Sequence, residues 1–246
     1  MNKVICIDIG NKNIKIGKFK NLKEKPEVFI DRKENSSKII EKLKNKYENS
    51  KIYGISVVPF IKERLMEKFK IKFFENNDFK EIKNPYIDKE KLGIDRIVNI
   101  YAAINLFKKD VIVIDFGTAI TIDLAFKNGD FKGGLIIPSP KTQLEVLSKK
   151  TALIKMDEIH KGLKIIGKST EECVSFGIKN VTVFGIKGII DMIKRKYRKN
   201  FKIIITGGDA FIYKKYLKNF LLFPYLTLYG VYIKSLRYEN NHKLSS

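Results

Sequence analysis

The chain has 246 residues, 44% of them hydrophobic, so it can bury one large core or two smaller ones. Its 49 Lys and Arg against 27 Asp and Glu give a formal net charge of +22, which raises the question of a polyanionic partner such as nucleic acid. The two cysteines are too few for a disulfide framework, which excludes small disulfide-stapled secreted proteins and favours a reducing cytoplasm.

The basic residues are spread along the chain rather than gathered in one block. Even the run KRKYRK at 194–199 is interrupted by apolar positions at helical spacing, which favours a solvated helix face over a nucleic-acid site. The N-terminal apolar run stops at Asp8, too early for a signal peptide. The most apolar later segment, 220–233, contains Pro224 and Gly230, so we predict no membrane span and a cytoplasmic protein.

The first half of the chain predicts a hairpin followed by alternating helices and strands. Alternating apolar residues on both sides of Gly10 predict strand, tight turn and strand. A helix follows, capped by Ser36 or Ser37, with apolar residues between 39 and 47 at helical spacing. Next come a strand at 51–58, a helix at 61–69, a short strand at 71–74, a polar loop at 75–91 and a helix at 97–107.

The second half predicts the same alternation. Strands begin at Val111 and Ala119, and a further strand occupies 134–137. A helix at 142–149, a long helix at about 170–195, a strand at 201–205 and another helix complete this half. The pattern predicts an α/β protein with two lobes, residues 1–109 and residues 110–246.

Both halves open with the same sequence pattern. The segment VICIDIGNKNIKIG from Val4 is echoed by VIVIDFGTAITIDL from Val111, and each first strand ends near an aspartate, Asp8 or Asp115, followed by a glycine. A carboxylate beside exposed backbone N–H groups suits a nucleotide triphosphate with its magnesium ion. Two such turns in register predict a duplicated fold that binds phosphates between its lobes.

These turns and several other motifs resemble those of the type III pantothenate kinases, members of the superfamily of acetate and sugar kinases, Hsp70 and actin. The motifs are DIGNKN at 8–13, GxDR at 93–96, DFGTAITID at 115–123, GGLIIPSP from Gly133, TAL from Thr151, GKST from Gly167 and GGDA from Gly207. The resemblance covers nearly the whole chain. It implies duplicated ribonuclease H-like (actin-like ATPase) lobes with a nucleotide cleft between them. It also implies transfer of the ATP γ-phosphate to pantothenate, giving 4'-phosphopantothenate, the first step of coenzyme A biosynthesis.

The GxDR element supplies the catalytic candidate. Asp95 matches the family's proton acceptor; the alternative is an aspartate that only caps the following helix. The resemblance also implies that Gly93, Ile94, Asp95 and Arg96 bind pantothenate, with the Arg96 guanidinium on its carboxylate. The alternative for Arg96 is a surface ion pair.

Two further residues match substrate-binding positions of the family. Tyr86 lies seven positions before Gly93, although Asp88-Lys89 replaces the family's Asn-Pro after it; the alternative is a loop tyrosine packed on its own lobe. Thr170 matches a threonine that reaches the pantothenate of a neighbouring subunit, which implies a homodimer. Its alternative, compatible with that role, is an N-cap with Glu172 nearby.

The resemblance assigns ATP binding to the two phosphate turns and to the turn after the last strand. Asp8 would orient Mg²⁺ through water, and Asp115 would bind a monovalent cation, K⁺ or NH₄⁺. For Gly207 and Gly208 the alternative is a plain strand-to-helix turn. The residues expected to bind ATP are Asp8, Ile9, Gly10, Asn11, Lys12, Asn13, Ile14, Lys15, Thr118, Gly207 and Gly208.

Two departures from the family leave rivals open. Lys12 stands where the family has threonine, with its ammonium either on the phosphates or in water, and Ser139 replaces the glycine of the family's Pro-Gly. One rival is a scaffold without catalysis that regulates or binds nucleic acid. The other is a different kinase or phosphatase of the superfamily. The first rival is disfavoured by the retained set of Asp8, Asp95, Arg96, Asp115 and Thr118. The second is disfavoured by GxDR between the phosphate motifs.

Overall fold

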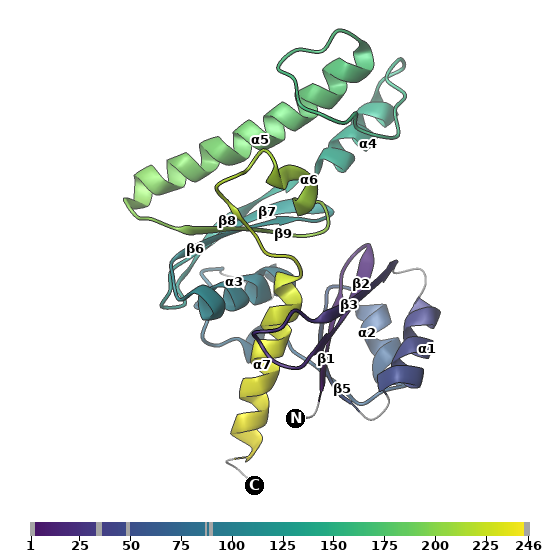
Figure 1. The fold of residues 1–246 in the computed structure, drawn as a ribbon, viewed down its shortest axis with the longest axis vertical. Coiled ribbons are helices and arrows are strands. Elements are labelled where there is room, and N and C mark those ends of the chain that lie inside the picture. Colours follow the sequence, from purple (N-terminus) through teal and green to yellow (C-terminus); the bar gives the residue numbers. More distant parts are fainter. Residues whose placement is uncertain (1–2, 33–35, 48–49, 87, 89–90, 244–246) are drawn as a thin grey trace. The chain divides into compact units, whose positions relative to one another are not determined.

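The computed structural model describes residues 3–32, 36–47, 50–86, 88 and 91–243, and its contacts divide the chain into two compact units (Figure 1). Apart from the residues outside this description, unit 1 comprises Met1–Lys109, Leu124–Gly133 and Tyr225–Ser246. Unit 2 comprises Asp110–Asp123 and Gly134–Pro224. The lobes 1–109 and 110–246 stay a prediction from the sequence, and in this division the segments Leu124–Gly133 and Tyr225–Ser246 belong to unit 1.

The sheet of unit 1 has the strand order β3-β2-β1-β4-β5. Strand β1 pairs antiparallel with β2 and parallel with β4; β2 pairs antiparallel with β3, and β4 parallel with β5. All six residues of β1 are buried, because the strand lies at the centre of the sheet. The strands are β1 Val4–Ile9, β2 Asn13–Phe19, β3 Glu27–Arg32, β4 Lys51–Ser56 and β5 Ile71–Phe73.

The second sheet repeats this order with the next five strands, β10-β9-β6-β7-β8. Its first strand, β6, again has its next two strands in sequence on one side and its last two on the other, and it pairs parallel with β9. Sequence periodicity therefore predicted the duplicated α/β fold correctly. The strands are β6 Val111–Phe116, β7 Ala119–Ala125, β8 Phe131–Pro138, β9 Lys202–Thr206 and β10 Leu221–Leu222.

The helices follow the predicted order, with two additions. The polar stretch expected as a loop contains a short 3₁₀ helix, η2 Asn76–Asp78, and a C-terminal helix was not predicted. In unit 1, Ile39 and Leu43 of α1 and Ile61 and Leu65 of α2 join the β-strand core. The helices are α1 Ser36–Tyr47, α2 Pro59–Met66, α3 Ile94–Phe107, α4 Pro140–Lys150, α5 Thr170–Tyr197, α6 Ala210–Lys214 and α7 Leu226–Lys243.

The unpredicted helix α7 belongs to unit 1, where it packs on α3 and β1. Gly230 made the segment read as broken, but it is the residue that allows close packing: a Cβ there would lie 2.6 Å from the backbone oxygen of Val98 in α3. Tyr232 of α7 stacks on Phe19 with ring centroids 4.4 Å apart. These contacts explain why the last residues of the chain join unit 1.

Helix α5 corrects the expectation that no segment could span a membrane. By length and composition alone, and among the helices described, α5 qualifies: its best window has a mean hydropathy of 1.4. Lys179 and Lys187 interrupt its apolar run, so the sequence shows no continuous apolar stretch. Within the chain, 44% of that window is buried. The helix therefore combines a face packed in unit 2 with an apolar face that is exposed.

Candidate active site

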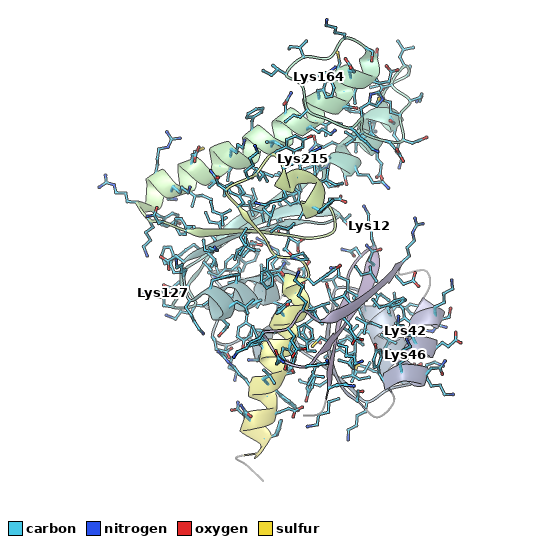
Figure 2. The ribbon with its side chains drawn as sticks, in the orientation of Figure 1. Lys12, Lys42, Lys46, Lys127, Lys164 and Lys215 are labelled. Atoms are coloured by element: carbon cyan, nitrogen blue, oxygen red, sulfur yellow. The ribbon has the colours of Figure 1, made fainter. Side chains whose placement is uncertain are left out.

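The first phosphate turn joins β1 to β2 in unit 1. The Gly10 backbone N–H donates to the Asn13 carbonyl oxygen at 3.0 Å and closes the turn, while Asn11 and Lys12 between them are exposed. Ile9 and Ile14 flank the turn from the buried core. The sequence placed this turn correctly, and Lys12 is exposed at its tip (Figure 2).

Asp8 has a partner that the sequence reading did not identify. The β1–β2 register sets Asp8 opposite Lys15, whose Nζ donates to Asp8 Oδ2 at 2.8 Å. The side chain of Asp8 is 7% exposed and that of Lys15 is 22% exposed, so the pair is only partly screened by water. Counting back from the Gly10 turn would have predicted this cross-strand pair.

The GxDR residues open helix α3. Gly93 is the N-cap, and Asp95 lies in the first turn, where its Oδ1 accepts a hydrogen bond from the Arg96 backbone N–H at 2.9 Å. The alternative role of Asp95 as the helix N-cap is therefore wrong by two positions. A Cβ at position 93 would lie 2.6 Å from Asp95 Oδ1, so the glycine makes room for this carboxylate. The N-terminal end of a helix also attracts anionic groups such as a bound substrate.

Arg96 is buried rather than at the surface, which corrects the alternative of a surface ion pair. Its Nη1 donates to the Tyr86 hydroxyl oxygen at 2.9 Å. The guanidinium carbon lies 5.9 Å from the centroid of the Tyr86 ring and 5.8 Å from that of Phe131, and the two rings stack 6.3 Å apart. Tyr86 therefore both packs on its own unit and contacts Arg96.

Phe131 is the first residue of β8 and follows the hairpin tip between β7 and β8. The Phe131 backbone N–H donates to the Lys83 carbonyl oxygen at 3.3 Å, and the Lys83 backbone N–H donates to that of Gly129 at 2.9 Å. Gly129 has a φ of +91° and no room for a Cβ against Glu81. The tip is thereby docked beside Tyr86. Lys89, part of the departure after Tyr86, lies outside the described residues.

The second phosphate turn joins β6 to β7 and repeats the first. The Gly117 backbone N–H donates to the Ala119 carbonyl oxygen at 3.1 Å, and Thr118 is exposed. The Thr142 hydroxyl donates to the Thr118 carbonyl oxygen at 3.1 Å. Ser139, the departure from the family motif, caps α4 by accepting from the Thr142 backbone N–H at 3.2 Å. The serine therefore supports the residue that holds the turn.

Asp115 and Gly207 lie against each other in unit 2. Asp115 pairs with Thr206 in the β6–β9 register, and Gly207 follows with a φ of +93°. A Cβ at Gly207 would collide with Asp115 Oδ1 and with the Phe116 carbonyl oxygen, so only glycine fits here. Gly208 is exposed, with open space where a Cβ would point. The backbone of Gly207 therefore lies closer to Asp115 and Phe116 than a plain strand-to-helix turn requires.

Thr170 is the first residue of α5 and is exposed. The cap is Ser169, whose hydroxyl accepts from the Glu172 backbone N–H at 3.2 Å, so the N-cap alternative for Thr170 is wrong by one residue. The preceding loop is tied to the same helix, since buried Lys179 donates to the carbonyl oxygens of His160 and Gly162. Burial lowers the pKa of Lys179.

The oxygen atoms of Asp8 and Asp115 suit Mg²⁺ and a monovalent cation, provided that ATP and water supply the remaining ligands. Over the described residues, no three or more His, Cys, Asp or Glu side chains gather as a metal cluster. Mg²⁺ needs only one or two carboxylates when phosphates and water complete its shell, so Asp8 fits an ATP-borne ion. Asp115 and the neighbouring Phe116 carbonyl oxygen are donors of the type that a monovalent cation takes.

Comparisons with known proteins agree with these motifs. The family described as type III pantothenate kinase matches residues 4–192. A type III pantothenate kinase of Sulfurihydrogenibium sp. (strain YO3AOP1) is 33% identical over 248 residues, covering 93% of this chain and 98% of that protein.

Solved structures share the fold. A Campylobacter jejuni protein, titled as a proposed Baf family transcriptional activator, has a TM-score of 0.66 at 24% identity and covers 96% of this chain and 99% of its own. The activator of 2-hydroxyisocaproyl-CoA dehydratase from Clostridium difficile, with bound ADPNP, has a TM-score of 0.55 at 13% identity, covering 98% and 97%. At such identities the likeness shows the fold alone, that of actin-like ATPases and sugar kinases.

The family match over residues 4–192 and the 33% identity to a relative along almost the whole of both chains lead to one conclusion. The chain belongs to the type III pantothenate kinase family.

Proposed function

We propose that this protein is an ATP-dependent pantothenate kinase that forms 4'-phosphopantothenate, the first step of coenzyme A biosynthesis. Membership of the family supports the reaction. The observation that carries the proposal is the cluster at the start of α3, where Gly93 leaves space for the Asp95 carboxylate and the next residue, Arg96, is buried beside two aromatic rings. A proton acceptor next to a guanidinium suits a substrate that has both a hydroxyl and a carboxylate.

In the proposed reaction, Asp95 acts as the general base. Its carboxylate accepts the proton of the primary hydroxyl, the hydroxyl oxygen bonds to the γ-phosphorus, and the bond to the β–γ bridging oxygen breaks to release ADP. The Arg96 backbone N–H donates to Oδ1 of this carboxylate at 2.9 Å. This bond also fixes the direction of the carboxylate.

Arg96 and Tyr86 are proposed to bind the pantothenate carboxylate and its chain, with Gly93 and Ile94 lining the start of α3. The Arg96–Tyr86 hydrogen bond and the stacked Phe131 ring hold the guanidinium in place before substrate arrives. Phe131 is thereby an added positioning residue. Preorganisation of this kind reduces the entropy lost on binding.

ATP binding is proposed for the two phosphate turns and for the Gly207-Gly208 turn. In unit 1, ATP binding is proposed for residues 8–15, which include the turn closed by the Gly10 backbone N–H and the Lys15 ammonium paired with Asp8. Asp8 is the proposed carboxylate for Mg²⁺. In unit 2, Thr118 is proposed for an ATP phosphate and the two glycines for adenosine. Mg²⁺ would neutralise charge on the transferred phosphate. Asp115 is the proposed ligand of K⁺ or NH₄⁺.

A homodimer is proposed from one face of α5. The α5 stripe, defined as Thr170, Gly177, Val181, Phe184, Gly188 and Met192, is exposed throughout and follows helical spacings of three, four and seven residues. Val181, Phe184 and Met192 are 68%, 55% and 65% exposed, and the two glycines have open space above them. An apolar stripe with small residues suits a second copy of the helix.

Thr170 begins this stripe, which is consistent with its proposed contact to the partner's substrate. A dimer would also bury the apolar residues that make α5 resemble a membrane helix, in keeping with a cytoplasmic enzyme.

The test is a coupled assay of ADP formation with ATP, Mg²⁺ and K⁺, with and without pantothenate. We expect pantothenate-dependent turnover, a product with the mass of 4'-phosphopantothenate, and loss of rate when Na⁺ replaces K⁺. Absence of product, together with tight salt-sensitive binding to DNA or RNA, would favour the inactive regulatory rival instead.

A further inference from the structure

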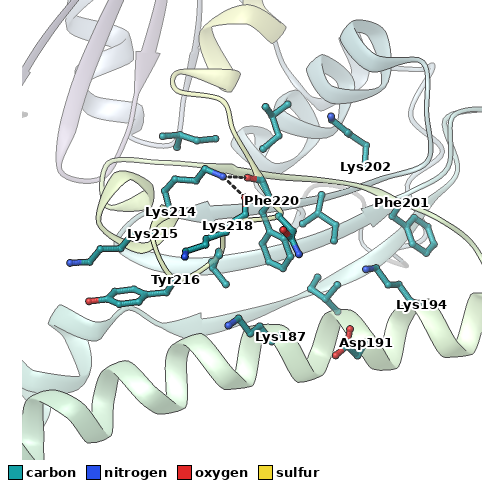
Figure 3. Close-up of a pocket in the computed structure, with 16 residues that line it drawn as sticks. Lys187, Asp191, Lys194, Phe201, Lys202, Lys214, Lys215, Tyr216, Lys218 and Phe220 are labelled. Carbon is teal, nitrogen blue, oxygen red and sulfur yellow. Dashed lines mark hydrogen bonds between the residues drawn. The ribbon is translucent and has the colours of Figure 1, made fainter. Parts of the chain in front are cut away.

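Unit 2 contains a groove between α5 and the segment that joins α6 to β10, and none of the residues that line it is assigned to catalysis or substrate binding (Figure 3). It has a volume of about 1000 Å³, which is the size of a small-molecule site. Its α5 wall presents Lys187, Asp191 and Lys194, and β9 contributes Lys202 and Ile203. Residues 214–222 form the opposite wall.

The groove is strongly basic. Of the sixteen described residues that line it, six are lysines and one is an aspartate, a basic share well above the 49 Lys and Arg in 246 residues of the whole chain. Figure 3 shows Lys187 and Lys194 directed from α5 towards the side on which Lys218 lies. Gathering ammonium groups at a concave surface raises their mutual repulsion and creates a field that favours an anion.

One lysine of the groove has a structural role. The Lys214 ammonium donates to the carbonyl oxygens of Lys218 and Phe220, each at 2.7 Å, and so fixes the wall leading into β10. The ammonium groups of four other lining lysines are not the donors of these two hydrogen bonds; they belong to Lys187, Lys194, Lys215 and Lys218. Lys187 and Lys194 are half-buried, so their charges are less screened than those of lysines on open surface.

The floor of the groove is apolar. Ile190 and Leu217 are buried in it, Ile203 and Phe220 are 8% and 9% exposed, and Tyr216 lies at its edge. A floor of this kind favours an apolar or aromatic body, while the lysines favour negative charge. A polyanion without an apolar part would leave the floor wet.

We propose that this groove binds a small phosphorylated molecule of nucleotide size, with an apolar or aromatic body on the floor and its phosphate between the α5 lysines and Lys218. The site is separate from the proposed kinase chemistry and does not depend on it. Its size favours a small molecule over RNA, because specific nucleic-acid interfaces usually extend over a larger surface.

The probe for this site is 1-naphthyl phosphate, which combines an aromatic body with a phosphate. The full chain, labelled at isoleucine methyl groups, is titrated and observed by NMR, since Ile190 and Ile203 line the groove and report binding there. We expect the methyl resonances of these two residues to shift in a saturable manner. Inorganic phosphate has the charge without the aromatic ring, and 1-naphthol has the ring without the phosphate. Each should bind about tenfold more weakly than 1-naphthyl phosphate.

The variant Lys187→Gln/Lys194→Gln should weaken 1-naphthyl phosphate about tenfold, and its pantothenate-dependent turnover should stay within about twofold of the wild type. Lys149→Gln/Lys150→Gln removes the same charge from the exposed end of α4 and should leave the affinity unchanged. Unshifted Ile190 and Ile203, equal affinity in the groove variant, or equal affinity for 1-naphthol would overturn the proposal. So would tighter binding of a short oligoribonucleotide at the same methyls.

Discussion

Gly93 faces the carboxylate of Asp95 across the first turn of α3, and a Cβ on Gly93 would lie 2.6 Å from Asp95 Oδ1. The backbone of Gly93, with φ −56° and ψ 132°, is open to any residue. The glycine therefore leaves space for this position of the carboxylate, and it is not required for backbone freedom. Its substitution by alanine consequently tests the position of the carboxylate with little change in the fold.

Gly93→Ala should lower kcat roughly tenfold or more, because the methyl group displaces the proposed base from its position. Thermal unfolding should change little. The control is a double-mutant cycle with Asp95→Asn: once the base is gone, the added methyl should cost no further activity. Additive losses in the double variant would mean that Gly93 acts on something other than Asp95.

Arg96→Lys should raise the KM for pantothenate by about tenfold or more, because lysine cannot form the bidentate contact with a carboxylate. Tyr86→Phe removes the hydroxyl that accepts from Arg96 Nη1 and should give a smaller rise in the same constant. Steady-state kinetics with each substrate varied separately supply the measurement. A change confined to the KM for ATP would indicate that Arg96 binds ATP and not pantothenate.

Much of this arrangement could be predicted from the sequence, and the reasons differ by residue. The duplicated sheet follows from the strand periodicity after Val4 and Val111. Helix α3 was expected at 97–107 but begins at Ile94, so that Asp95 lies inside its first turn rather than before it. Phe131 could not be predicted, because its place beside Arg96 depends on the docking of a hairpin tip 35 positions away. The helix around Gly230 was not predicted, because a glycine in a sequence usually indicates the interruption of a helix. Here the glycine allows close packing on α3 instead.

Lys12 of the first phosphate turn and Lys15 of the following strand β2 should behave differently. Lys15→Met removes the ammonium that pairs with buried Asp8, so we expect a higher KM for ATP and a loss of unfolding free energy of about 1–2 kcal/mol. Lys12 is exposed, and Lys12→Ala should raise only the KM for ATP, several-fold or about 1 kcal/mol. Thermal denaturation and ATP titrations separate the two. An unchanged KM in Lys12→Ala would assign that ammonium to solvent.

Phe184→Glu should convert the proposed dimer to a monomer, because it puts a charge in the middle of the α5 stripe. Size-exclusion chromatography with light scattering gives the mass, and activity should fall with it if Thr170 serves the neighbouring site. Phe60→Glu makes the same exchange at an exposed phenylalanine of unit 1 and should leave the mass unchanged. A wild-type protein that is monomeric and fully active would contradict this assembly.

Asp95→Asn keeps the shape of the side chain but removes its capacity to accept a proton. Its kcat for 4'-phosphopantothenate formation, measured at saturating ATP and pantothenate beside the melting temperature, is the deciding quantity. With Asp95 as the base, kcat falls by roughly 100-fold or more while the melting temperature and both KM values stay close to those of the wild type. Turnover near the wild-type rate would contradict that role and leave Asp95 as a structural residue of the first turn of α3.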